Sequence, residues 1–227
     1  MSAQITSESS DTTTKPTILL LSLENELFFD SMFARLIDAI AAKATLKRAT
    51  EATAALDFLS ANTPSAIFIT DPGLLEAANA AVLERVVSYV RGGGTAVIGG
   101  LFSGFVQPLD LGDWFRSQWG LLWKFAEYHR TTVHLNPHAQ RVPQLGLPAA
   151  YSQKAVFLKN VGSNASWYLP LDDSMTDELD DFHPQSEDDR QTPVAFTALG
   201  YGWLGYIGDV NAEQGSDAVV LAMCGLL

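Results

Sequence analysis

The stretch YVRGGGTAVIGGLFSG, residues 89–104, is the part of the sequence that best indicates the fold. It reads as the end of a helix, a glycine turn, a short apolar strand and a glycine-rich loop. In open α/β sheets, ligands bind and reactions occur at the loops that follow the carboxyl ends of the parallel strands, here called the crest. Related folds hold a cysteine or serine on a tight turn at this place. Here the frame from Gly100 to Gly104 has Phe102 at its centre, with Ser103 beside it.

The segments before this stretch alternate between strand and helix patterns. Short apolar runs predict buried strands, and apolar residues recurring every three or four positions predict helices. The predicted strands are 17–23, 44–50, 66–70 and 95–98, and the predicted helices are 26–42, 53–61 and 74–91. Such alternation is typical of a doubly wound, mostly parallel sheet with helices on both faces.

The pattern changes after residue 105. An aromatic stretch at 114–125 looks helical and 129–135 looks extended. Two further strands, 155–158 and 166–169, are predicted to form a hairpin across residues 162–164. The last elements are an antiparallel C-terminal hairpin of 194–198 and 203–207, then a helix that Ser216 caps and that runs to Met223.

This pattern predicts one domain over residues 16–227. It carries an aromatic-rich insertion around 106–170 and an acidic loop at 171–192, which we interpret as solvated and mobile. Residues 1–15 form a polar Ser/Thr-rich stretch, which predicts a flexible tail without the features of a secretory signal.

Composition limits the function. A formal net charge of −12 in 227 residues argues against binding nucleic acid or an anionic membrane surface. No apolar run approaches the roughly 20 residues that a membrane-spanning helix needs. The single cysteine, Cys224, cannot form an internal disulfide, so we expect a cytoplasmic protein.

Three stretches carry a resemblance to a known family. They are VRGGGTAVI at 90–98, PVAF at 193–196 and GYGWLGYIGD at 200–209. With them the chain resembles the class I glutamine amidotransferase-like superfamily, and within it the ThuA-like (trehalose-utilisation) branch and related uncharacterised fungal proteins. The resemblance implies a flavodoxin-like three-layer fold. It covers the sheet and hardly the middle third of the chain.

The residues depart from that superfamily where its chemistry lies. In true amidotransferases, the resemblance implies a cysteine on the tight turn that works with a downstream His-Glu pair. Cys224 instead lies in the predicted last helix among small and apolar residues, where it should be a packed side chain. No His-x-Glu follows the last strand, which is followed by DVNAE at 209–213. Glutaminase activity is therefore not expected.

Polar residues near the ends of the predicted strands are the candidate site. We expect Ser103, His129 and Asp209 as catalytic candidates, because a serine hydroxyl needs a general base to react. The expected ligand-binding residues at the same crest are Glu24, Asn25, Asp71, Phe102, Asn211 and Glu213. The alternatives are structural: Asp209 and Asn211 would cap turns and the last helix, and Ser103 would be a turn residue.

No cofactor or metal is expected. Asn136-Pro137 between His134 and His138 breaks any helix that would align the two imidazoles on one metal ion.

The leading hypothesis is a catalytically degenerate amidotransferase-like domain that serves as a small-molecule binding or assembly module. The alternative is a hydrolase of a carbohydrate-related metabolite that uses crest carboxylates and a histidine. A third hypothesis is a homo-oligomer in which the tryptophan-rich segment packs against a second copy.

Overall fold

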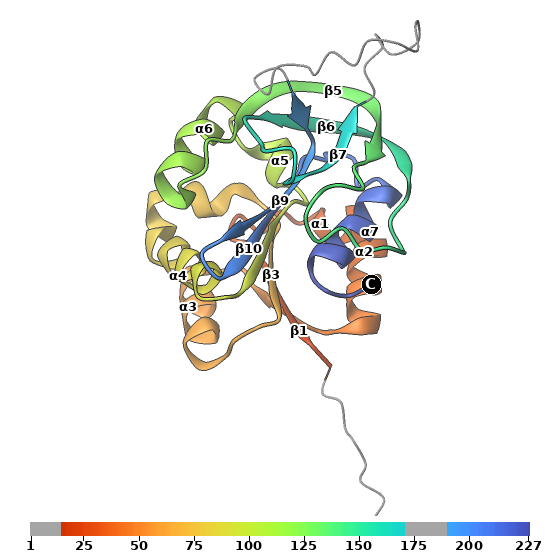
Figure 1. Ribbon diagram of the computed structural model, residues 1–227. Coiled ribbons are helices and arrows are strands. Elements are labelled where there is room, and N and C mark those ends of the chain that lie inside the picture. The colour runs from red at the N-terminus through yellow and green to blue at the C-terminus, as the bar shows by residue number, and fades with distance from the viewer. Residues whose placement is uncertain (1–14, 171–189) are drawn as a thin grey trace, which may run out of the picture.

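The computed structural model describes residues 15–170 and 190–227. Its sheet confirms the α/β class (Figure 1), with strand order β2-β1-β3-β4-β10-β9-β7-β5-β6-β8. The first five strands in this order are parallel to one another. They are β2 (Thr45–Ala49), β1 (Thr17–Leu21), β3 (Ala66–Ile69), β4 (Thr95–Ile98) and β10 (Gly202–Ile207). Most of the acidic segment and the N-terminal stretch lie outside the described residues.

The central strands are apolar because both of their faces are covered. Every residue of β3 is buried, as are the last four residues of β1. The edge strand β2 is mostly exposed, with only Ala49 buried. This difference is what a parallel sheet between two helical layers requires.

Helices cover both faces of the parallel part of the sheet (Figure 1). One face carries α1 (Phe29–Met32), α2 (Ala34–Lys43) and α7 (Gln214–Met223). The other carries α3 (Ala52–Ala61), α4 (Ala80–Arg91), α6 (Leu111–Trp114) and the π-helix η4 (Phe115–Trp119). Each face has its own apolar core.

Two predicted helices are shorter than the sequence suggested. The segment 26–42 is divided at Phe33, whose ring stacks on Phe29 with centroids 4.9 Å apart. The segment 74–91 begins instead as two 3-10 turns, η1 (Pro72–Leu75) and η2 (Ala77–Asn79). The Asn79 side chain donates to the Gly73 carbonyl at 2.7 Å and holds the chain in these turns.

The remaining strands extend the sheet in antiparallel fashion. They are β5 (Lys124–Leu135), β6 (Ala150–Lys159), β7 (Ser166–Pro170), β8 (Gln191–Thr192) and β9 (Val194–Leu199). The hairpin predicted from 155–158 and 166–169 is wrong, because β5 lies between β6 and β7 and pairs with both. Its twelve residues are long enough to take two partners. An apolar run alone does not specify its partner.

The aromatic segment 114–125 is helical only as far as Trp119. Gly120 then adopts a left-handed conformation with φ of 73°, and Phe125 already belongs to β5. Before it lie the short α5 (Phe102–Phe105) and the 3-10 turn η3 (Pro108–Asp110). The chain returns from this layer into β5, which arches over the top of the molecule in Figure 1.

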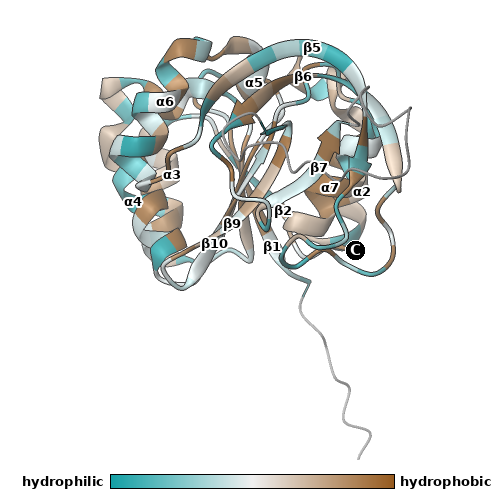
Figure 2. Ribbon diagram, turned by 45° about the horizontal axis from the view of Figure 1, so that its top comes forward, coloured by the Kyte–Doolittle hydropathy of each residue, from teal (hydrophilic) through white to brown (hydrophobic). Residues whose placement is uncertain are grey.

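The C-terminal hairpin is confirmed, with Gly202 opposite Leu199 and Ile207 opposite Val194. A Cβ atom at Gly202 would lie 2.1 Å from the carbonyl oxygens of Gly94 and Val90, so only glycine fits where β10 meets the glycine turn. Figure 2 shows hydrophilic residues along the arch of β5.

The last helix differs from its prediction at one end only. It begins at Gln214, so Ser216 lies within it and is not its cap. It ends at Met223, as predicted.

Candidate functional site

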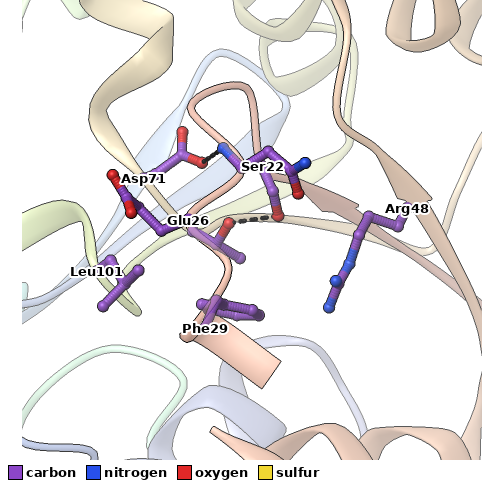
Figure 3. A pocket seen from close by; sticks show the side chains of 8 residues that line it. Ser22, Glu26, Phe29, Arg48, Asp71 and Leu101 are labelled. Carbon is purple, nitrogen blue, oxygen red and sulfur yellow. Dashed lines mark hydrogen bonds between the residues drawn. The ribbon is translucent and has the colours of Figure 1, made fainter. Parts of the chain in front are cut away.

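The order in which the chain adds strands to the sheet reverses at β1. From β1 the chain crosses to β2 on one side, while β3 pairs with the other side of β1. Open α/β sheets bind ligands at such switch points, outside the carboxyl ends of the strands. A pocket of about 10 Å³ lies there, enough for about one water molecule. Figure 3 shows it, lined by Ser22, Asn25, Glu26, Phe29, Arg48, Thr70, Asp71 and Leu101.

Asp71 is buried at this switch point and bound by main-chain groups. Its carboxylate accepts hydrogen bonds from the backbone N–H groups of Leu23, Glu24 and Gly73 at 3.1 Å and of Asn25 at 3.3 Å. Burial raises the pKa of Asp71, and the four N–H donors act in the opposite direction. The carboxylate therefore ties the loop after β1 to the end of β3.

The loop after β1 brings Glu24 and Asn25 beside Asp71, as the sequence predicted. Asn25 has a left-handed backbone with φ of 51°, a conformation that asparagine tolerates. The Glu24 side chain is exposed, and its pKa is raised by partial burial and by the carboxylates of Asp71 and Glu76. Among the described residues, Glu24 is the predicted crest carboxylate whose side chain forms no hydrogen bond or ion pair.

Hydroxyl groups close the base of the pocket. The hydroxyls of Ser22 and Thr70 lie 2.7 Å apart, and Thr70 also donates to the Leu21 carbonyl at 3.1 Å. On the open side, the Arg48 guanidinium lies over the Phe29 ring, 5.4 Å from its centroid, and pairs with Asp30. Arg48 comes from the edge strand β2, which the sequence did not single out as part of a site.

Ser103 faces the interior of the fold. It is 2% exposed, and its hydroxyl lies 3.1 Å from both the Tyr206 hydroxyl and the Ile207 carbonyl. The Tyr206 hydroxyl donates in turn to the Val156 carbonyl at 3.1 Å. Within the described residues, no hydrogen bond joins Ser103 to a histidine. A serine without a base is a poor nucleophile.

The other residues predicted from the G-x-x-x-G frame and its surroundings lie elsewhere. Phe102 is fully buried and packs on Trp114 with centroids 5.6 Å apart. His129 lies on β5, where its ring stacks on Phe157 at 4.3 Å. Its Nδ1 is 3.4 Å from a Glu127 carboxylate oxygen, so its charged form would pair with that carboxylate.

Asp209 organises the turn between β10 and α7. It is 4% exposed, and its carboxylate accepts from the backbone N–H groups of Asn211 at 2.8 Å and Glu213 at 2.7 Å. Burial raises the pKa of Asp209 above its usual value of 3.8, although Ser216 and the two N–H donors oppose this. The sequence analysis gave a structural alternative for Asp209, in which it caps the turn before the last helix, and these hydrogen bonds fit that alternative.

Asn211 and Glu213 are bound by an arginine that the sequence analysis did not identify. Arg130 on β5 donates to the Glu213 carboxylate at 2.7 Å. With its amide oxygen turned toward this guanidinium, Asn211 accepts from it at 2.6 Å. Nothing in the local sequence marks Arg130, because Asn211 and Glu213 are more than eighty positions away from it.

The predicted crest thus divides into separate groups. Glu24, Asn25 and Asp71 meet at the switch point, whereas Asp209, Asn211 and Glu213 form a second group that β5 and β6 cover. Strand β6 crosses this second group directly: Val156 N–H donates to Gly208 at 2.9 Å, and Val210 N–H donates to Lys154 at 3.0 Å. A cavity beside Asp209 also measures only about 10 Å³.

In the part of the chain that the structure describes, no three side chains of His, Cys, Asp or Glu are grouped so as to hold a metal ion. Across residues 15–170 and 190–227, no helix combines the length and apolar character needed to cross a bilayer. Cys224 is 5% exposed, and burial raises the pKa of its thiol to about 12.

Comparison with known proteins shows the fold. No protein-family model matches the chain, and no curated protein matches it in sequence. Solved structures do match: the α/β fold is that of proteins described as ThuA-like. One from Bacteroides uniformis has a TM-score of 0.58 at 11% identity, covering 96% of this chain and 94% of its own. Another, from Parabacteroides merdae, has a TM-score of 0.58 at 12% identity, covering 93% and 89%.

A longer protein contains the same fold as one part. The β-galactosidase of Bacillus circulans sp. alkalophilus has a TM-score of 0.54 at 12% identity, and the match covers 93% of this chain but 31% of the β-galactosidase chain. At such identities the likeness concerns the fold alone.

Proposed function

We propose that this chain is a degenerate amidotransferase-like domain of the cytoplasm, of the type found in fungi, that acts by binding and assembly and not by catalysis. The observation that supports this is the state of the candidate reactive groups. The Ser103 hydroxyl and the Asp71 and Asp209 carboxylates are all buried and engaged in internal hydrogen bonds. Groups bound in this way hold loops in place and are not free to transfer protons or attack a substrate.

Apolar side chains are exposed at the same crest. Phe28, after β1, and Phe105, after β4, contact each other with ring centroids 5.9 Å apart. They are 42% and 45% exposed, and the neighbouring Leu27 is 95% exposed. These three residues form the crest apolar cluster. Grouped exposed aromatic residues are typical of binding surfaces, since aromatic rings supply much of the energy of protein interfaces.

A second copy of this chain is the partner that we propose for the crest apolar cluster. In a two-fold symmetric dimer the same patch meets itself. An apolar patch is complementary to itself, whereas the acidic surface of a chain with net charge −12 repels its own copy. Association through Leu27, Phe28 and Phe105 would bury apolar area of both copies.

Light scattering after size exclusion tests this proposal. We expect a dimer at about 50 µM protein, a concentration at which dimers with micromolar dissociation constants are populated. The double variant Phe28→Ser/Phe105→Ser should be a folded monomer. Leu145→Ser removes an apolar side chain that is 85% exposed and lies outside the cluster, and this variant should remain a dimer. A monomeric parent protein, or a double variant that still dimerises, would contradict the proposal.

Glu24 supports the alternative, hydrolysis of a carbohydrate-related metabolite. It is exposed at the switch point, and the neighbouring carboxylates help to raise its pKa, which suits a general acid. Hydrolysis of glycosides or sugar esters that is lost in Glu24→Gln, and retained in the matched variant Glu51→Gln, would establish this activity and overturn the non-catalytic proposal.

A further inference from the structure

Carboxylate side chains lie beside the crest apolar cluster, on the loop after β1. Glu26 directly precedes Leu27 in the chain and is half-buried, whereas Glu24 is exposed. Partial burial raises the pKa of Glu24, and the nearby carboxylates of Asp71, Glu76 and Glu26 raise it further. Four carboxylates from three loops therefore lie close together at the edge of the cluster.

The basic residue nearest to these carboxylates already has a partner. Arg48, on β2, lines the switch-point pocket and pairs with Asp30 of α1. In Figure 3 it lies on the opposite side of the pocket from Glu26 and Asp71. Within residues 15–170 and 190–227, Glu24 and Glu26 take part in no ion pair.

The other side of the crest apolar cluster adds no positive charge to oppose them. Phe105 belongs to the segment 99–107, which contains no charged residue. The turn after β10 packs against this segment. In that turn, main-chain N–H groups bind Asp209, and Glu213 pairs with Arg130. In the described part of the chain, the surroundings of the cluster thus keep a net negative charge.

A two-fold dimer would bring this charge close to its own copy. In such a dimer the same patch of both copies meets, so residues that flank the patch in one copy lie near those of the other. A like charge nearby disfavours the ionised form of a carboxyl group. Formation of the dimer would therefore favour the protonated form of a flanking glutamate.

We infer that the dimer takes up protons at Glu24 as it forms, so that acid strengthens the association. This inference rests on the proposed function and adds its regulation. The Glu24 carboxyl holds its proton more tightly in the dimer than in the monomer. Association is therefore strongest when Glu24 is protonated in both states, and it weakens as the pH rises and the dimer loses these protons.

Sedimentation equilibrium at two pH values tests the inference. A glutamate whose pKa is raised above 4.5 titrates near pH 5. We expect the dissociation constant of the parent dimer to be about fivefold lower at pH 5 than at pH 7.5. In Glu24→Gln it should be about fivefold lower than in the parent at pH 7.5, and should no longer change with pH.

A control variant separates the position of the charge from the total charge. Asp57→Asn removes one exposed carboxylate from α3, and this variant should keep the pH dependence of the parent. A parent protein that is monomeric at both pH values contradicts the proposed dimer and overturns this inference with it. A dimer with equal dissociation constants at the two pH values overturns the inference alone. The inference is also overturned if Glu24→Gln keeps the parent's pH dependence, or if Asp57→Asn loses it.

Discussion

The hydroxyl of Ser103 lies 3.1 Å from the hydroxyl of Tyr206, in the interior beneath the crest. Through Tyr206 this pair reaches the Val156 carbonyl on β6. The serine that the sequence offered as a nucleophile therefore links α5 to β10 and to the strand that crosses above it. Its surroundings are those of a structural hydrogen bond.

Removing this hydroxyl should affect stability. Ser103→Ala is expected to lower the free energy of unfolding by about 1 kcal/mol, and Tyr206→Phe by a similar amount. Because the two groups form one chain of hydrogen bonds, the double variant should lose less than the sum of the single losses. Urea unfolding of the four proteins measures this. Strictly additive losses would show that the two hydroxyls act independently.

Asp209 should make stability depend on pH. Folding raises its pKa above 3.8, so the folded protein holds this proton more tightly than the unfolded chain does. Its contribution to stability is therefore greatest below pH 3.8 and decreases as the pH rises through the raised pKa. The free energy of unfolding of the parent protein, measured by urea unfolding, should exceed that of the Asp209→Asn variant by a larger amount at pH 3.5 than at pH 7. Asp110 is exposed, and for the control variant Asp110→Asn this difference should not change between the two pH values. If the difference for Asp209→Asn were larger at pH 7, the raised pKa of Asp209 would be refuted.

Two crest glycines should respond differently to alanine. A Cβ at Gly208 would lie 2.1 Å from the Val156 carbonyl oxygen, so Gly208→Ala must push β6 away from the crest. We expect a loss of about 3 kcal/mol. At Gly104 the nearest atoms, those of Val210, are 3.8 Å away, so Gly104→Ala should change stability by less than about 1 kcal/mol. Equal effects in thermal unfolding would contradict the packing of β6.

Cys224 should not react in the folded protein. Its thiol is buried and its pKa is raised to about 12, so almost no thiolate is present at pH 8. We expect labelling by an aromatic disulfide reagent to be at least about a hundredfold slower than in denaturant, because only the unfolded chain exposes the thiol. Rapid labelling under native conditions would show that α7 opens.

The sequence predicted the parallel strands well because each is a short apolar run bounded by turn residues, as in β3 and β4. It also located the C-terminal hairpin through Gly200 and Gly202. It could not show that β5 separates β6 from β7, since that choice depends on pairing between distant segments.

The candidate site was predictable in part. The predicted ends of the strands were sufficient to place Glu24 and Asn25 beside Asp71. That Asp71 would be saturated by backbone donors, and that Ser103 would point inward to Tyr206, depends on loop conformation and on residues more than forty positions away. Arg130, which binds Glu213 from β5, has no local signal at all.

The place of β10 in the sheet has a consequence for biosynthesis. This strand lies between β4 and β9, so the N-terminal parallel strands and the later antiparallel strands are joined through residues 202–207. As the chain leaves the ribosome, β4 presents an unpaired edge until that segment emerges, and exposed edges favour aggregation. A nascent chain stalled before Gly202 would hold two partial sheets without the strand that unites them, and would be a natural client for a chaperone.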